Sequence, residues 1–375
     1  MAFARMERRR ALATRKAAYL LFLLTPTLMP AALHLGSLTG LPDLMAWYPV
    51  FWIFGLIPVL DFAIGEDRVN PDEATETRAM QDDPYYRALT LLAVPIQAVM
   101  LAWGAWVFAD WPFGPWGMLG WLVSMGVVSG INAINIAHEL VHRHGRLEPW
   151  AGGFLLSLVG YAGFKVEHVR GHHVNVSTPL DASSARYGQS LYAFLPHAWK
   201  WNFLNAWRLE AERLRRRGLP ALHWHNELIW WHGLSLAVAG TLAWAFGWLG
   251  LVFFAGQSFV AFTELEIINY VEHYGLHRRV RADGRFERTT HQHSWNSSYL
   301  LTNLFLFQLQ RHSDHHAHPA RRYQVLRHFD DSPQLPAGYA TMVLLALVPP
   351  LWHRVMDPRV EAYYGDEPEQ LAAVR

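Results

Sequence analysis

The chain has 375 residues, of which 52% are hydrophobic and 14% aromatic, and its formal net charge is +1. Its length would allow two soluble domains, but several apolar runs are long enough to cross a bilayer, which favours a single membrane-embedded body. The 18 tryptophans suit aromatic belts at the two membrane surfaces. The chain contains no cysteine, which excludes disulfides, cysteine-held zinc and iron–sulfur clusters within it.

Six apolar segments are predicted to cross the membrane as helices, because each is long enough and nearly free of charge. In chain order they are residues 17–35, 44–65, 88–109, 116–137, 227–246 and 249–271. Glycine, proline and aspartate between neighbouring segments are turn signals. The expected fold class is therefore an all-α integral membrane protein with one domain over residues 1–375. Residues 138–226 and 272–375 would form a histidine-rich cap that contains re-entrant helices.

Charge in the connections predicts the orientation of this bundle. The short connections at 36–43, 110–115 and 247–248 contain no lysine or arginine, whereas the N-terminus and the other loops hold nearly all of them. The positive-inside rule then places the N-terminus and the cap in the cytoplasm. Six crossings bring the ends of the second, fourth and sixth segments to the same face.

Four histidine clusters lie at this face, and their spacing indicates a metal site. Histidine is the commonest metal ligand, and residues three or four apart share one side of a helix. On a regular helix His168 and His172 share a side, whereas His173 lies about 100° further round and could bind a second metal. One metal takes roughly four to six ligands, so nine histidines predict two metals. The nine are His138, His142, His168, His172, His173, His273, His312, His315 and His316.

Two further sets of residues surround the predicted ligands. Carboxylates next to the clusters are expected to accept the second N–H of a ligating imidazole rather than to bind metal. They are Glu139, Glu167, Asp181, Glu272 and Asp314. Residues about one helical turn inside the membrane are candidates to line an apolar substrate tunnel. They are Ile131, Ile134, Asn135, Leu265, Ile267, Ile268, Phe305 and Leu309. Bulky residues of the second segment, Phe51, Trp52 and Leu56, are expected to close its far end.

Two other functions share parts of this pattern. His138, Glu139 and His142 have the spacing of a zinc-protease helix, but one zinc ion would leave seven histidines unused. A divalent-metal transporter would carry polar residues at mid-bilayer, whereas the histidines lie at the ends of apolar segments.

The histidine boxes HX3H, HX3HH and HX2HH resemble those of integral-membrane di-iron desaturases and hydroxylases. Four segments resemble signatures of bacterial alkane 1-monooxygenases: His138 to Arg143, Glu167 to His173, Asn269 to Leu276, and Leu309 to Ala317. The third is the most specific, because it separates alkane hydroxylases from fatty-acyl desaturases. The resemblance covers about residues 15 to 355 and departs at Arg143, where the family usually has lysine.

The resemblance implies two iron ions, O2 as co-substrate, and terminal hydroxylation of medium-chain n-alkanes to 1-alkanols. An all-imidazole site also suits zinc, copper or nickel, so iron is implied by the resemblance alone. Electrons are expected from rubredoxin and its NADH-dependent reductase, and no nucleic acid is expected as a partner. The implied location is the bacterial inner membrane, within lipid, with the active site facing the cytoplasm. A membrane fatty-acyl desaturase or an aryl-methyl (xylene-type) monooxygenase is the alternative.

Arginines near the third and fourth clusters are candidates to receive the electron donor. Rubredoxins resemble small acidic proteins, and complementary charge chiefly raises the rate of association. The expected docking residues are Arg278, Arg279, Arg321 and Arg322.

Overall fold

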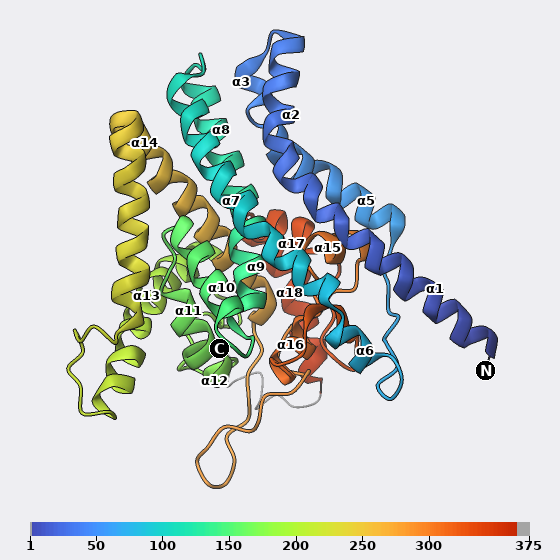
Figure 1. Cartoon of the computed structure of the whole chain (residues 1–375). Coiled ribbons are helices and arrows are strands. Elements are labelled where there is room, and N and C mark those ends of the chain that lie inside the picture. The colour runs from blue at the N-terminus through green and yellow to red at the C-terminus, as the bar shows by residue number, and fades with distance from the viewer. Residues whose placement is uncertain (1, 366–375) are drawn as a thin grey trace.

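The computed structural model describes residues 2–365, with side chains from Met6 onward. In this part of the chain the regular elements are helices, joined by loops that contain isolated β-bridges. The first segment is one rod that runs from α1 through η1 into α2, and shorter helices return beside it (Figure 1). These elements are α1 (Ala2–Ala18), η1 (Tyr19–Leu23), α2 (Leu24–Thr39), α3 (Pro42–Met45), α4 (Tyr48–Phe51), η2 (Trp52–Leu56) and α5 (Ile57–Ile64).

A long helical hairpin comes next and leads to the first histidines. It consists of α6 (Thr77–Asp82), α7 (Pro84–Asp110), α8 (Pro115–Ser129), η3 (Gly130–Asn135) and α9 (Ile136–Val141). Pro84 and Pro115 each stand at the start of a helix, where proline needs no partner for a backbone N–H. Because α8, η3 and α9 follow one another without a break, residues 115–141 form one rod. Its lower end carries the first histidine pair.

α14 (Glu227–His273) contains both remaining predicted segments. Its backbone reverses at Gly247, whose φ of 63° and ψ of −151° are not helical, so two arms lie side by side (Figure 1). The arms pack closely, because a Cβ at Gly250 would lie 2.1 Å from the Leu242 carbonyl oxygen. The second arm descends to His273 and meets α8 along its length (Figure 1).

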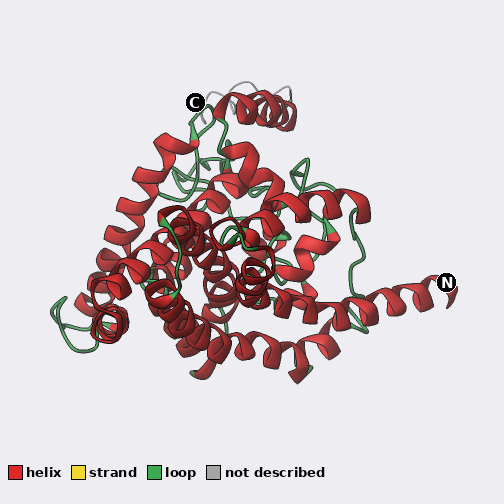
Figure 2. Ribbon diagram, turned by 90° about the horizontal axis from the view of Figure 1, so that it is seen from above, coloured by secondary structure: helices red, strands yellow, loops and turns green. Residues whose placement is uncertain are grey.

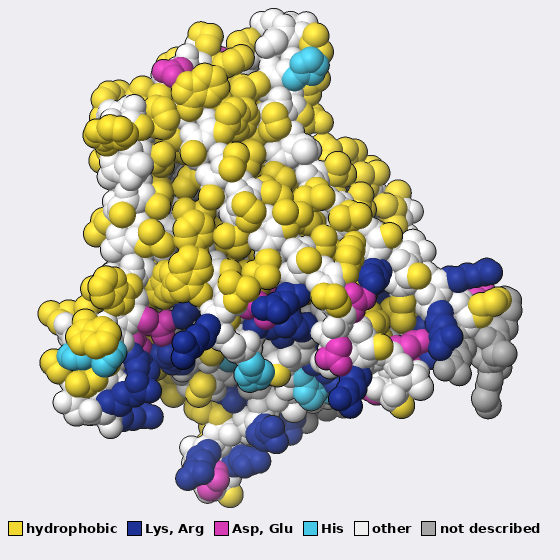
Figure 3. All heavy atoms as spheres, in the orientation of Figure 1, with side chains coloured by type: hydrophobic (Ala, Val, Ile, Leu, Met, Phe, Trp, Pro, Cys, Tyr) yellow, Lys and Arg dark blue, Asp and Glu magenta, His cyan; other side chains and the backbone are white. Residues whose placement is uncertain are grey.

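Within the described part of the chain, four helices are long and apolar enough to cross a membrane: Met6–Thr39, Thr77–Asp110, Pro115–Val141 and Glu227–His273. The apolar helix Tyr48–Ile64 is shorter. On the face shown in Figure 3, hydrophobic side chains cover the upper body and charged side chains gather in a lower band. Outward-facing apolar residues such as Trp244, which is 87% exposed, are expected where lipid replaces water. The protein is therefore a membrane protein, and the number of six crossings remains a prediction.

The helices that follow α9 and α14 form the cap, and most of them are short. After α9 come α10 (Leu147–Leu158), α11 (Phe164–Glu167), η4 (His168–His172), α12 (His173–Asn175) and α13 (Leu191–Arg215). After α14 come α15 (Leu300–Phe305), α16 (His312–Ala317), η5 (Tyr323–Val325), α17 (Tyr339–Ala346) and α18 (Pro349–Tyr364). Seen from above, some helices are viewed nearly end-on and others lie around them (Figure 2).

An aromatic cluster joins the first rod to the segment before α16. Tyr19 stacks on Phe307 at 6.0 Å and meets the edges of Tyr86 and Tyr323. These rings are buried in the main core cluster with residues of α9 and α10. The aromatic cluster fixes the segment that leads into the last histidine cluster of the sequence, because Phe307 is only five residues before His312.

Candidate metal centre

The structure gathers the nine predicted ligand histidines into two groups. His138, His142, His168, His173 and His315 form the first, and His172, His273, His312 and His316 form the second. Within each group, one ring nitrogen of every histidine lies within 4.8 Å of the corresponding nitrogen of every other. The rod of residues 115–141, the cap and the second arm of α14 thus bring their histidines to one place, where two metal ions could be held.

The division of the second cluster follows from a π-helical turn. In η4 the backbone N–H of His173 donates to the carbonyl of His168, five residues earlier. An i→i+5 bond widens the turn and brings residues five apart to one side. His168 and His173 therefore share the first group, with Nε2 atoms 3.1 Å apart. The expectation that His168 would share a side with His172 was wrong, because it assumed a regular helix.

The last cluster also contributes to both groups. His315 Nε2 lies 3.0 Å from His173 Nε2, whereas His316 Nε2 lies 3.2 Å from His172 Nε2. His312 and His316 are one turn apart on α16, and their Nε2 atoms are 2.8 Å apart. Because His315 and His316 are adjacent in sequence, α16 lies between the two groups.

The residues present fit metal ions. Several Nε2 atoms face other Nε2 atoms across about 3 Å, and the buried Nε2 of His138 has no hydrogen-bond partner. Burial, followed by neighbouring imidazoles, lowers the pKa of His168, His173, His312, His315 and His316 well below 6.5. These imidazoles are therefore neutral, the form in which histidine binds metal.

Two of the five carboxylates contact ligand histidines. Asp181 accepts from His172 Nδ1 at 2.9 Å and from the Ser184 hydroxyl at 2.6 Å. Although burial raises the pKa of Asp181, the contact with His172 leaves it below its usual value. Glu272 Oε2 lies 3.0 Å from His312 Nε2, and its other oxygen accepts from Tyr339. Glu272 therefore contacts Nε2 of His312, the nitrogen that faces the other histidines of its group. The sequence had predicted a contact with the nitrogen that faces away from the group.

The other three carboxylates have different surroundings. Glu139 pairs with Arg143 at 2.8 Å, and Asp314 pairs with Arg321 at 2.7 Å. Their other oxygens accept from the backbone N–H groups of Tyr323 and Arg327. The expectation that these two carboxylates would accept from ligand imidazoles was therefore wrong. The Arg143 pair also leaves Glu139 poorly placed as a protease general base. Glu167 is buried, and burial with the nearby Asp181 and Glu266 carboxyls raises its pKa well above 4.5.

Asp181→Ala should lower metal affinity or activity about 10- to 100-fold, because loss of a partner that orients a ligating histidine has effects of this size. Metal content and turnover of purified protein would measure it. The exposed Asp110→Ala, far from the histidines at the other end of α7, is the matched control and should match the wild type. Equal behaviour of the two variants would show that Asp181 does not orient His172.

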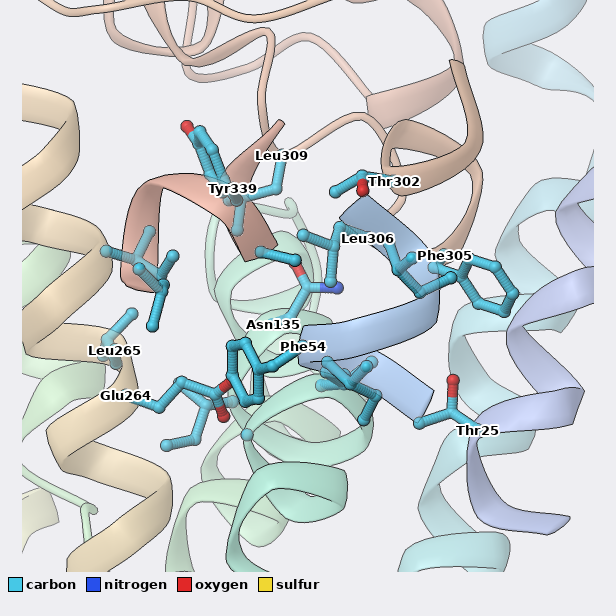
Figure 4. Close-up of a pocket in the computed structure, with 18 of the residues that line it drawn as sticks. Thr25, Phe54, Asn135, Glu264, Leu265, Thr302, Phe305, Leu306, Leu309 and Tyr339 are labelled. Carbon is cyan, nitrogen blue, oxygen red and sulfur yellow. The ribbon is translucent and has the colours of Figure 1, made fainter. Parts of the chain in front are cut away.

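An apolar cavity runs from the first histidine group into the membrane body (Figure 4). Seven of the eight predicted tunnel residues line it, together with His138, Trp52, Phe54, Glu264 and Tyr339. Ile267 does not line it and packs instead in the core cluster with residues of α13 and α17. Phe51 and Leu56 were wrongly expected to close the tunnel, since both side chains are exposed on the outside. Trp52 is the one residue of that set at the cavity wall.

The arginines expected to receive the electron donor are mostly engaged within the protein. Arg278 is buried and donates to the Val174 carbonyl at 2.7 Å. Arg321 pairs with Asp314 and Glu73, and Arg322 pairs with Glu148. Reversing the charge of these three residues would disturb the cap itself, so they are unsuitable as docking probes.

Two buried polar residues of this region and one at the cavity wall were not predicted from the sequence. Arg311 is fully buried beside the last cluster, Tyr339 donates to Glu272, and Glu264 lines the cavity. A signal was available for Glu264, because it is an acidic residue inside the apolar segment 249–271 and such residues are usually functional. Nothing in the local sequence distinguishes Arg311 or Tyr339.

Comparison with known proteins agrees with this architecture. The fatty acid desaturase family model matches residues 113–346. Alkane 1-monooxygenase 1 of Pseudomonas aeruginosa is 60% identical over 363 residues, which cover 96% of this chain and 95% of the relative. Alkane 1-monooxygenase 2 of the same organism is 59% identical over 95% of each protein. Alkane 1-monooxygenase 2 of Alcanivorax borkumensis is 55% identical over 95% of this chain and 94% of its own length. The chain therefore belongs to the alkane 1-monooxygenases, a group of oxidoreductases within the fatty acid desaturase family of membrane enzymes.

Proposed function

We propose that the protein hydroxylates the terminal carbon of medium-chain n-alkanes at a di-iron centre held by the nine histidines. The observation that carries this proposal is the apolar cavity that ends at His138. A hydrocarbon has no polar group to recognise, so it requires an apolar channel that leads directly to the reactive group. Iron supplies the O2 chemistry that an unactivated C–H bond requires.

The net reaction converts an alkane, O2, two electrons and two protons into a 1-alkanol and water. Ile134, Leu265 and Ile268 would hold the chain by burial alone and exclude water from it. His138 lines the cavity at the end where the reacting carbon must lie. Asp181 would keep His172 in one tautomer through its hydrogen bond.

The direct test is purified, iron-loaded protein incubated with octane, O2, NADH, reductase and rubredoxin. The expected product is 1-octanol, and its formation should require every component. The same preparation offered a fatty-acyl substrate or m-xylene tests the two alternative functions. An olefin, or benzylic oxidation faster than octane oxidation, would assign the protein to one of those activities instead.

The topology proposed with this function has six crossings and one domain, in the bacterial inner membrane with the cap in the cytoplasm. It is supported by the lower band of charged side chains at the level of the cap (Figure 3). On that side the centre would be accessible to a soluble electron donor. The chain has no cysteine to hold an iron–sulfur or rubredoxin site of its own, so an external donor must supply the electrons. We take rubredoxin as that donor because the resemblance to alkane 1-monooxygenases implies it.

A basic hairpin is the better candidate for the docking of this donor. Residues 278–288 project from the cap (Figure 1), closed by the Val280–Phe286 bridge and a turn at Gly284. Arg281, Arg285 and Arg288 are exposed on it. The Arg278 N–H donates to the Ser177 carbonyl at 2.7 Å. This bond fixes the base of the hairpin beside the segment that carries His168, His172 and His173.

Reversing Arg281 and Arg285 together to glutamate should slow rubredoxin-driven turnover about tenfold at low salt, because opposite charge raises association rates. Initial rates at several rubredoxin concentrations and ionic strengths would measure this. The exposed pair Arg216 and Arg217, reversed in the same way, is the control. Equal slowing in both double variants, or no dependence on salt, would place the docking site elsewhere.

The cavity should also set the length of the accepted alkane. Trp52 lines it and packs edge-on against Phe305 at 5.3 Å. Trp52→Ser would remove this wall, so we expect longer alkanes to gain in kcat/KM relative to octane while attack stays at the terminal carbon. The neighbouring Phe51→Ser, which faces outward, is the matched control. An unchanged chain-length profile in Trp52→Ser would exclude this wall as the limit.

A further inference from the structure

Glu264 is the one acidic residue among the described residues that line the mostly apolar cavity. The other polar lining residues are Thr25, Asn135, His138, Thr302 and Tyr339. Glu264 projects from the second arm of α14 toward the opposite wall, where Phe54 lies (Figure 4). Its Oε2 atom is buried and has no hydrogen-bond partner among the described residues. The other acidic residue of this segment, Glu266, is by contrast fully engaged, with Tyr161, Asn202 and Asn269 as donors.

The position of the Glu264 carboxyl depends on a glycine in the facing rod. A Cβ at Gly130 would lie 2.2 Å from Glu264 Oε2, so any other residue there would displace the carboxyl. Gly130 begins the π-helical turn η3 and also lines the cavity. The carboxyl therefore occupies a space that the chain leaves open for it.

A buried polar atom without a partner destabilises the protein by about 1 to 3 kcal/mol, and an isolated charge would cost far more. No lysine, arginine or histidine is paired with Glu264 among the ion pairs of the described residues. The group is therefore expected as the neutral acid, which offers one O–H donor and acceptor oxygens. A ligand atom that satisfied this group would recover the missing hydrogen bond.

Two parallel measures give the distance from this carboxyl to the histidines. Eight residues separate Glu264 from Glu272, and eight separate Gly130 from His138. At the α-helical rise of 1.5 Å per residue, the first interval spans about 12 Å along its helix. The second contains the wider π-helical turn η3 and is somewhat shorter. An extended hydrocarbon advances roughly 1.25 Å per carbon, from the 1.52 Å bond length and an angle near 111°. A chain of about nine carbons thus reaches from Glu264 to the histidine centre.

We propose that Glu264 binds the oxygen-bearing end of medium-chain substrates whose other, methyl end is oxidised. The inference rests on the proposed function and extends its substrates to neutral chains with a hydroxyl group at the far end. A 1-alkanol suits the carboxyl best, because its hydroxyl both accepts from the acid O–H and donates to the carbonyl oxygen. A chain that ends in a carboxylate would meet the acidic group without a counter-charge and is excluded.

The reaction is that proposed for alkanes. 1-Nonanol, O2, two electrons from the donor protein and two protons give nonane-1,9-diol and water; one C–H bond is replaced by C–O, and the second oxygen atom leaves as water. The reverse orientation puts the hydroxyl at the histidines and gives nonanal with two waters. The ratio of diol to nonanal therefore reports orientation within one preparation.

The test uses the iron-loaded protein with rubredoxin and its reductase, offered 1-nonanol, and compares products by gas chromatography. Glu264→Leu should lower the diol-to-nonanal ratio about tenfold, as expected for the loss of one hydrogen bond. Glu264→Gln keeps a donor and an acceptor and should retain most of the ratio. Thr263→Val is the matched control, because the Thr263 hydroxyl is also buried without a partner but does not line the cavity. Its ratio should equal that of the wild type.

Thermal stabilisation by the ligand tests the same proposal in variants whose activity is too low for product analysis. 1-Nonanol should raise the melting temperature of the detergent-solubilised wild type more than n-nonane does, and Glu264→Leu should remove this difference. Wild type that oxidises n-nonane but yields only nonanal, or an unchanged ratio in Glu264→Leu, would overturn the role of Glu264. Failure to oxidise n-nonane at all would instead overturn the proposed function.

Discussion

Replacing any one of the nine histidines with alanine should abolish alkane oxidation, and the two groups should lose metal in different ways. The wild type should carry about two iron ions per chain. His142→Ala leaves four histidines in the first group, whereas His172→Ala leaves three in the second. Because the second group has one ligand fewer to begin with, His172→Ala should lose its ion more completely. Iron per chain, measured by elemental analysis beside turnover, distinguishes the two cases.

The control for these variants is His144→Ala. His144 follows the first pair by two residues, is exposed, and belongs to neither group, so its metal content and activity should equal those of the wild type. Wild-type protein with one iron per chain, or full activity in His273→Ala, would contradict the two-metal assignment.

The sequence was sufficient to find the helical segments and the histidines, because long apolar runs and spacings of three and four residues are local signals. It could not assign each histidine to a group. That assignment depends on the π-helical turn η4, in which an i→i+5 hydrogen bond replaces the regular i→i+4 bond. Nothing in the amino-acid composition of the segment predicts this change. The same limit explains Ile267, since neighbours on a helix point about 100° apart and only Ile268 faces the cavity.

The carboxylates show a second limit. Glu139 and Asp314 stand next to ligands in the sequence, but their partners are arginines. Asp181 is eight residues beyond His173 in the chain, yet it contacts His172 because the intervening segment folds back. Local sequence therefore predicted which histidines cluster better than it predicted the contacts of the carboxylates. The ligands follow helix geometry, whereas the orienting contacts depend on tertiary packing.

Arg311→Met should have the second large effect, by removing the support of the last histidine cluster. The Arg311 side chain is fully buried, and its guanidinium donates to the carbonyls of Asp67 and Leu326, each at 2.7 Å. Burial lowers the pKa of Arg311 to about 9, which still leaves it charged at neutral pH. Arg311 thus ties the residue directly before His312 to two distant segments, one at Asp67 and one at Leu326.

The backbone before Arg311 increases the need for this support. Phe307 and Gln308 have φ values of 51° and 60°, which residues other than glycine rarely adopt. Such a conformation persists only when its surroundings fix it. Here the Gln308 amide donates to the Tyr19 hydroxyl at 2.9 Å, and the Gln308 N–H donates to the Asn303 carbonyl at 2.8 Å. Arg311 holds the other end of the same turn.

Methionine would fill the space but leave the two carbonyls without donors, at about 1 to 3 kcal/mol each. That loss is a large part of a typical unfolding free energy of about 5 to 15 kcal/mol. We expect a lower melting temperature of the metal-free protein and less iron in both groups, because α16 supplies both. Arg311→Lys should rescue little, since a single ammonium lacks the guanidinium fork. Arg359→Met, at an exposed position of α18, is the control. Normal stability and iron content in Arg311→Met would show that the aromatic cluster alone positions the last histidines.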